Sequence, residues 1–196
     1  MKKYEFTGES KTVNGVTVKR IRAIKEFGST KSGSLGGWIE SERNLSQEDN
    51  CWVADNACAY GNAIIRDNAR LYENAIVHGN AVLSDGAVVT DKAEVYGNAH
   101  VGELARIDGV AKIFGNAYIV GSAHIGDNAH VGGNAIIGGK AIIEGTARVY
   151  GHTKVSGDTL LVSGNYQGCD EIDEIDDIDE YLDECYLDEC DLGECF

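Results

Sequence analysis

An alanine occupies every sixth position of the chain from Ala57 to Ala147, sixteen times without interruption. An apolar residue lies two positions after each of these alanines, and a pair such as Gly-Asn or Asp-Asn closes most of the six-residue units. Residues two apart in an extended strand point to the same side, so the alanine and the apolar residue are expected to face a core. Gly and Asn tolerate the left-handed backbone of a tight corner, so the pattern predicts short strands joined by corners.

A second period, equal to three of these units, indicates three corners in each coil. Every third corner is a glycine, whereas the other two series of corners mix Asp, Glu and Gly. The glycine series consists of Gly61, Gly79, Gly97, Gly115, Gly133 and Gly151. The asparagines that follow are predicted to stack as a hydrogen-bonding ladder, at Asn62, Asn80, Asn98, Asn116 and Asn134. Coils stacked about 4.8 Å apart would form a triangular prism of about six turns.

This repeat resembles the hexapeptide-repeat superfamily, the left-handed parallel β-helices, over about residues 33 to 162. The handedness is implied by the resemblance, since parallel crossovers are normally right-handed. A further resemblance, to the first coil of bacterial and phage hexapeptide proteins labelled as transferases, is carried by Leu35-Gly36-Gly37-Trp38-Ile39-Glu40, by Asn44-Leu45-Ser46 and by Trp52-Val53.

The expected fold is therefore all-β: a triangular solenoid with an N-terminal β-hairpin cap and an acidic C-terminal tail. Caps are needed because an open solenoid end exposes apolar core and unpaired strand edges. Val13-Asn14-Gly15-Val16 has the composition of a two-residue hairpin turn, and Trp38 is placed to cover the first coil. The predicted parts are a β cap over residues 1–37, the hexapeptide-repeat solenoid over residues 38–168 and the tail over residues 169–196.

The net charge of −15 belongs to the tail. Residues 170–196 hold 14 Asp and Glu and no Lys or Arg, so the rest of the chain carries 18 of the 32 acids and all 17 bases. A nearly neutral body argues against direct nucleic-acid binding. Residues 1–31 carry eight bases and three acids, so the two ends of the chain have opposite signs and could attract each other or a second copy.

The start of the chain, MKKYEFTGES, has two lysines without an apolar stretch behind them, and no apolar run approaches the length of a membrane span. We therefore expect a cytoplasmic protein without membrane association. Its six cysteines are expected to be reduced there: Cys51, Cys58, Cys169, Cys185, Cys190 and Cys195. Cys51 replaces a core alanine and should be a buried thiol.

The tail allows several structures. The spacing of its apolar residues from Ile172 to Cys185 is that of one helix face, and a five-residue repeat follows over residues 181–195. An extended acidic segment, or one ordered against the solenoid or a partner, is equally compatible with this composition. The carboxylates predicted to contact a basic protein surface are those of Asp173, Glu174, Asp176, Asp177, Asp179, Glu180, Asp183, Glu184, Asp188 and Glu189.

Catalytic residues are not predicted. The resemblance implies that an acyltransferase of this kind would use a histidine at a cleft between subunits of a trimer, with a loop that interrupts the repeat, and no such loop exists between Ala57 and Ala147. His100, His124 and His130 each follow a repeat alanine and fall on three different faces, which argues against a metal site within one subunit. Acyl transfer remains the alternative. An intersubunit metal site like that of the related carbonic anhydrases is a third possibility. No cofactor is expected.

Two outward columns, read at every third unit of the repeat, are apolar. One is an aromatic ladder of Tyr60, His78, Tyr96, Phe114 and Tyr150, with Gly132 at one rung. The other holds Ile64, Val82, His100, Tyr118 and Ile136. Such stripes favour a homo-oligomeric interface, and the resemblance favours a trimer, although stacking within one chain would also explain them.

The leading interpretation is a non-catalytic binding and assembly protein that presents its tail to a basic partner. A specific form is a phage-type inhibitor whose carboxylates imitate nucleic-acid phosphates in a host protein.

Overall fold

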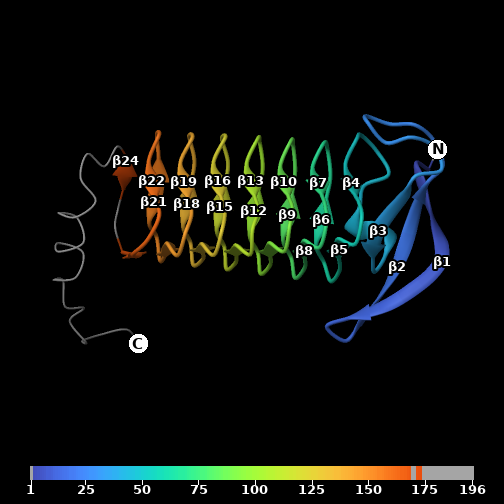
Figure 1. Ribbon diagram of the computed structural model, residues 1–196, viewed down its shortest axis with the longest axis horizontal. Helices are drawn as coiled ribbons and strands as arrows, with labels where there is room; N and C mark the ends of the chain where they lie inside the picture. Colours follow the sequence, from blue (N-terminus) through green and yellow to red (C-terminus); the bar gives the residue numbers. More distant parts are fainter. Residues whose placement is uncertain (1, 169–170, 174–196) are drawn as a thin grey trace.

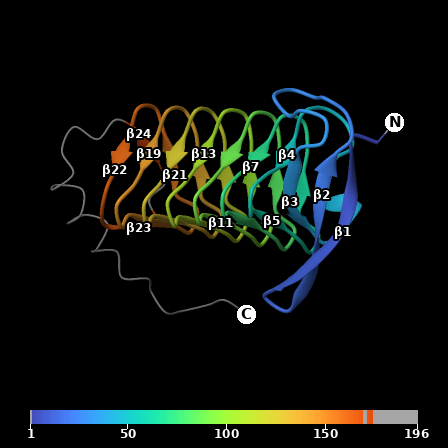
Figure 2. The same cartoon turned by 45° about the vertical axis from the view of Figure 1, so that its right-hand side comes forward.

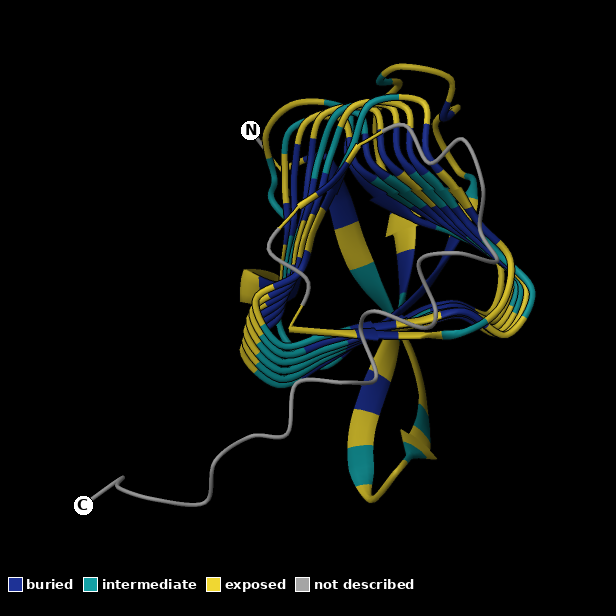
Figure 3. Ribbon diagram, turned by 90° about the vertical axis from the view of Figure 1, so that its left-hand side faces the viewer, coloured by how far each residue is buried: buried dark blue, intermediate teal, exposed yellow. Residues whose placement is uncertain are grey.

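The computed structural model describes residues 2–168 and 171–173. These residues form a prism of stacked coils with the N-terminal strands at one end (Figure 1). Each coil contributes one short strand to each of three sheets, so the prism has a triangular outline when viewed along its axis (Figure 3). The predicted all-β solenoid is confirmed.

The ten-stranded sheet, here the long sheet, consists of β1 (Tyr4–Val13), β2 (Val16–Ala23), β3 (Leu35–Ile39), β5 (Cys58–Ala59), β8 (Ile76–Val77), β11 (Glu94–Val95), β14 (Lys112–Ile113), β17 (His130–Val131), β20 (Arg148–Tyr150) and β23 (Asn165–Gln167). The seven-stranded β4 sheet consists of β4 (Trp52–Val53), β7 (Arg70–Leu71), β10 (Val88–Val89), β13 (Arg106–Ile107), β16 (His124–Ile125), β19 (Ile142–Ile143) and β22 (Leu160–Leu161). The seven-stranded β6 sheet consists of β6 (Ile64–Ile65), β9 (Val82–Leu83), β12 (His100–Val101), β15 (Tyr118–Ile119), β18 (Ile136–Ile137), β21 (Lys154–Ser156) and β24 (Ile172–Asp173). A 3-10 turn, η1 (Glu42–Asn44), lies in the first coil.

The core is the alanine and aliphatic pattern. Every repeat alanine from Ala57 to Ala147 is fully buried, as is the apolar residue two positions later, while the residue between them faces outward. Figure 3 shows this alternation of buried and exposed positions around the triangle. Cys51 lies among the core residues, as expected, and burial raises the pKa of its thiol.

The corners have left-handed backbone at the first residue of each pair. All six residues of the glycine series have positive φ, from 66° at Gly133 to 73° at Gly97. Glu73 and Glu103 adopt the same conformation with φ of 56° and 53°, which is uncommon for a residue with a Cβ. The left-handed residue is therefore the Gly, Asp or Glu of the corner and not the asparagine after it.

The asparagine ladder is confirmed. The side-chain amide of Asn62 donates to Asn80 at 2.9 Å, Asn80 to Asn98 at 2.9 Å, and the series continues through Asn116 to Asn134 at 3.0 and 2.8 Å. Carboxylates form a second type of ladder at other corners, where the backbone N–H of Glu103 donates to Asp85 and that of Gly121 donates to Glu103.

The N-terminal hairpin caps the first coil (Figure 2). The strands β1 and β2 pair antiparallel around Asn14 and Gly15, both with positive φ, as the turn composition predicts. The first coil is covered by Tyr4 and Ile21, which join the main core. Trp38 packs in a separate cluster with Val18, Cys58 and Tyr60, so it covers outward residues of the first coil and not its apolar core.

Lys3 is fully buried under this cap. Its ammonium donates to the carbonyl oxygens of Glu48 at 2.7 Å and Cys51 at 2.9 Å, and it lies 3.2 Å from the Cys51 sulfur. The carbonyl of Leu45 accepts from the Tyr4 hydroxyl at 2.8 Å. The cap therefore closes the polar backbone of the coil as well as its apolar core.

The coil continues beyond the predicted end of the repeat. The strand β24 pairs with β21 so that Ile172 lies beside Val155, and Ile172 is buried. This step is one position shorter than the usual coil, and the pairing of Val149 with Tyr166 is shortened in the same way, so the shortening lies in the corner after β22. Ile172 and Asp173, expected in the tail, are thus in a strand, and residues 169–170 and 174–196 of the predicted tail lie outside the described residues. The part of the chain that the structure describes contains no helix with the length and apolar character needed to span a bilayer.

Replacing Gly97 by Ala is predicted to lower the free energy of unfolding by more than about 1 kcal/mol, because left-handed backbone is costly for a residue with a Cβ. The new Cβ would also lie 2.9 Å from the backbone N of Gly115. Denaturant unfolding measures the loss. The control is Gly138→Ala, whose Cβ would meet only Val120 at 3.9 Å and whose φ is not positive. Equal losses in the two variants would contradict the account of the corner.

Candidate functional site

Each of three outward histidines lies on a different sheet. His100 is in β12 of the β6 sheet, His124 in β16 of the β4 sheet and His130 in β17 of the long sheet. The predicted separation is confirmed. Within residues 2–168 and 171–173, no group of three or more His, Cys, Asp or Glu side chains is arranged to hold a metal ion.

These three histidines share a local motif, because a glycine follows each of them two positions later. Without a side chain, the glycine leaves a notch on the outer face, into which a side chain from the preceding coil leans. A Cβ at Gly126 would lie 2.7 Å from the Asp108 carboxylate, and one at Gly132 would lie 2.5 Å from the Phe114 ring. The notch at Gly102 is bordered by Ser84, Asp85 and His100 in the same way.

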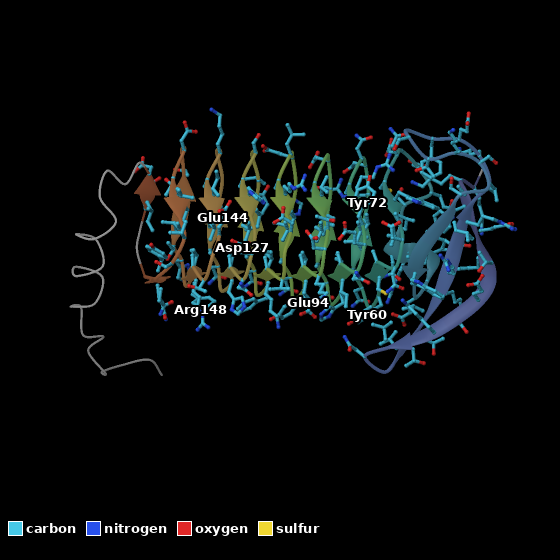
Figure 4. The ribbon with its side chains drawn as sticks, viewed as in Figure 1. Tyr60, Tyr72, Glu94, Asp127, Glu144 and Arg148 are labelled. Atoms are coloured by element: carbon cyan, nitrogen blue, oxygen red, sulfur yellow. The ribbon has the colours of Figure 1, made fainter. Side chains whose placement is uncertain are left out.

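The notch at Gly126 brings charged groups together. His124 Nε2 lies 2.9 Å from Asp108 Oδ2, and His124 Nδ1 lies 3.7 Å from Glu144 Oε1. With Asp127 at the nearby corner, these residues line a cavity of about 100 Å³, and Figure 4 shows Asp127 and Glu144 on the same side of the prism. A carboxylate that holds one imidazole nitrogen fixes the ring and supports proton transfer at the other, so this is the best candidate for chemistry in the described chain.

The notch at Gly102 is chemically different. The Ser84 hydroxyl donates to Asp85 at 2.8 Å and lies 3.5 Å from His100 Nε2. Ser84 is only 1% exposed, and its proton is held by a carboxylate instead of the imidazole. This arrangement does not activate the hydroxyl as a nucleophile, since the base must contact the nucleophile. Burial lowers the pKa of His100, and the positive charge of Arg66 lowers it further.

The Asp108 partner of His124 was not predicted from the sequence. The two residues are 16 apart, one coil less two positions, and the pairs His78 with Glu94 and Ser84 with His100 have the same separation. A search for polar residues at this separation from each outward histidine would have found all three pairs. The periods of the hexad and of the coil identify columns but not these diagonal contacts.

The aromatic ladder is stacked within the chain. The rings of Tyr60, His78, Tyr96 and Phe114 follow one another at 5.0, 5.2 and 5.4 Å, with interplanar angles of 12° or less. Tyr60 is buried and the other rings are partly buried. The stacking alternative is therefore present in the structure, whereas the interface alternative stays a prediction.

The second column is more open. On the β6 sheet, Ile64, Tyr118 and Ile136 are 41%, 45% and 42% exposed. Val82 and His100 lie between them in register, and His100 stacks on Tyr118 at 4.8 Å. The result is a straight apolar stripe over five coils on a flat face.

No family model matches the chain. A 61-residue stretch is 36% identical to an Escherichia coli (strain K12) protein named "Uncharacterized acetyltransferase YdcK". The match covers 27% of this chain and 19% of that protein, so the chain spans about a fifth of the length of the curated relative it matches. Together with the triangular solenoid, this similarity supports the resemblance to hexapeptide-repeat proteins.

His100 is predicted to titrate below the usual histidine pKa of about 6.5, which NMR of the imidazole measures directly. The lowered pKa means that the folded state binds the proton less readily than the unfolded chain. Its contribution to stability is therefore present above about pH 6.5 and is lost as the pH falls below that value. His100→Gln should lose less stability than the parent between neutral and mildly acidic pH. A midpoint at or above the usual value would contradict the burial of this ring.

Proposed function

We propose that this chain is a non-catalytic binding and assembly protein. The observation that carries the proposal is the stripe of the β6 sheet, in which Ile64, Tyr118 and Ile136 are exposed and Val82 and His100 are half-buried between them. Contiguous apolar surface of this kind is characteristic of interaction sites. A second copy is the occupant that fits best, because a flat face repeated at every coil matches itself and closed homo-oligomers use such surfaces.

The proposal includes the acidic segment as the part that binds a basic protein surface. Glu171 and Asp173 are its described members, and Asp173 is exposed beside the end of the β6 sheet. The remaining carboxylates lie outside the described residues. The support is their charge: 14 acids without a base would attract a positive groove, including one that a host protein uses for nucleic-acid phosphates.

A second function, acyl transfer, is favoured by one specific observation, the contact between His124 and Asp108 beside a small cavity. In that role Asp108 would orient the ring, and His124 would take a proton from an acceptor amine or hydroxyl. The acetyltransferase name of the partial relative is compatible with it. No loop interrupts the coils beside this notch to form a wall, so a substrate would need a neighbouring subunit.

The double variant Tyr118→Glu/Ile136→Glu is predicted to reduce the mass of the assembled protein to that of a single chain, because charges on the stripe would have to be desolvated in the interface. Light scattering measures the mass. The control is Val110→Glu, an equally exposed apolar residue at a corner away from the stripe. A parent that is already monomeric would refute assembly through this face.

Removing residues 174–196 separates the two functions. If the segment captures a basic partner, the truncated chain should stay folded and lose binding in a pull-down, and binding by the full chain should weaken steeply with salt, since the Debye length at 0.15 M is about 8 Å. The parallel variant is His124→Ala, which should leave binding unchanged. The assembly account fails if the truncated chain still transfers acetyl groups from acetyl-coenzyme A as the full chain does and His124→Ala abolishes this transfer.

A further inference from the structure

The aromatic ladder of the long sheet lacks one rung, at Gly132. Phe114 and Tyr150 are two coils apart, which in a straight ladder corresponds to about 9.6 Å. Their ring centroids are nevertheless 5.8 Å apart, and the rings are tilted by 53°. A Cβ at Gly132 would lie 2.5 Å from two atoms of the Phe114 ring. The rings of Phe114 and Tyr150 therefore close over the space of the missing rung.

That space has the thickness of one planar ring. The rungs above it are nearly parallel, with an interplanar angle of 2° between His78 and Tyr96 and 12° between Tyr96 and Phe114. Phe114 is therefore already in line with Tyr96, and the tilted ring is that of Tyr150. If Tyr150 turned parallel to Phe114 at its own rung, a gap of about two rung spacings would open between the two rings. A ring inserted there would stack on both sides, which is the arrangement that aromatic side chains offer to nucleobases.

A basic column lies beside this gap on the same face. Lys112, His130 and Arg148 occupy adjacent coils in register, and both Lys112 and Arg148 are exposed. Figure 4 shows Arg148 on the same long edge of the prism as Tyr60 and Glu94. The column therefore flanks the gap over its whole height.

Acidic side chains do little to neutralise the positive charges of this column. The Lys112 ammonium is 3.8 Å from Glu94, whereas Arg148 has no ion pair within residues 2–168 and 171–173. The adjoining outward positions, Phe114, Gly132 and Tyr150, are uncharged. Burial lowers the pKa of His130, and the positive charges of Arg148 and Lys112 lower it further. This is a positive patch on a body whose charges otherwise nearly cancel.

We propose that the Gly132 gap and the column of Lys112, His130 and Arg148 form a binding site for a planar aromatic molecule that carries a phosphate group. The ring takes the place of the missing rung after Tyr150 turns parallel to Phe114. The phosphate contacts the ammonium and guanidinium groups, which are suited to phosphate oxygens. His130, whose Nδ1 lies 3.4 Å from the Tyr150 hydroxyl, sits between them.

The test is calorimetric titration of the full chain with adenosine monophosphate at low salt, with adenosine and inorganic phosphate as separate probes. We expect adenosine monophosphate to bind, because it makes both the stacking and the charge contacts. Adenosine and inorganic phosphate, which each make only one kind of contact, should bind at least roughly tenfold more weakly. Phe114→Ala should weaken binding severalfold, because one of the two stacking faces is lost. Arg148→Gln should weaken it roughly tenfold, and Arg106→Gln on the β4 sheet is the matched control without effect.

Gly132→Tyr completes the ladder and should abolish binding of the monophosphate while thermal unfolding shows a folded protein. If that variant does not fold, the losses in Phe114→Ala and Arg148→Gln, measured against Arg106→Gln, still decide. Unchanged binding by Gly132→Tyr, equal binding of inorganic phosphate and the monophosphate, or no binding to the parent at millimolar ligand would each overturn the proposal.

Discussion

The structure depends on one repeated interaction, the backbone hydrogen bond from the N–H of one residue to the carbonyl of the residue just before its counterpart in the next coil. The N–H of Cys58 donates to the carbonyl of Ala75 at 2.9 Å, and that of Asn62 donates to Gly79 at 2.7 Å. Because the same bonds recur in each coil, a side chain is followed by its counterpart one strand spacing further along. The alanine core, the asparagine ladder, the aromatic ladder and the apolar stripe of the β6 sheet all follow from this register.

The register also gives the prism a polarity. At the corners, the N–H groups of Asn62, Asn80 and Asn98 all donate toward the C-terminal end, so the carbonyl groups they reach point toward the N-terminus. The first coil consequently presents carbonyl oxygens that need donors. This explains why a lysine is buried under the cap. The charge of Lys3 would be costly in an apolar site, but its ammonium group donates hydrogen bonds to several of these carbonyl oxygens. The side-chain amide of Asn44 likewise donates to the carbonyl oxygens of Gly61 and Ala63.

Most of the fold could be predicted from the sequence because its strongest signals are periodic. The spacing of the alanines assigns the inward face, and the glycine series identifies the corners, as the burial of Ala57 to Ala147 and the positive φ of Gly97 confirm. Periodicity did not reveal two features, a change in the length of the coil and a contact between residues of different columns. The shortened step that brings Ile172 beside Val155 was missed because the pattern was read at a fixed interval. The contact of Asp108 with His124 was missed because it joins different columns in neighbouring coils.

We propose that function lies in the outward columns, which the three-hexad coil keeps in line. A duplication of residues 93–98 tests it most directly, because one added hexad preserves the alanine spacing while turning every later coil by one face. Light scattering should show that this variant, folded by circular dichroism, loses the assembled mass of the parent. A duplication of the whole coil, residues 81–98, should keep that mass. Full assembly by the variant with one added hexad would contradict the account, because its columns no longer line up.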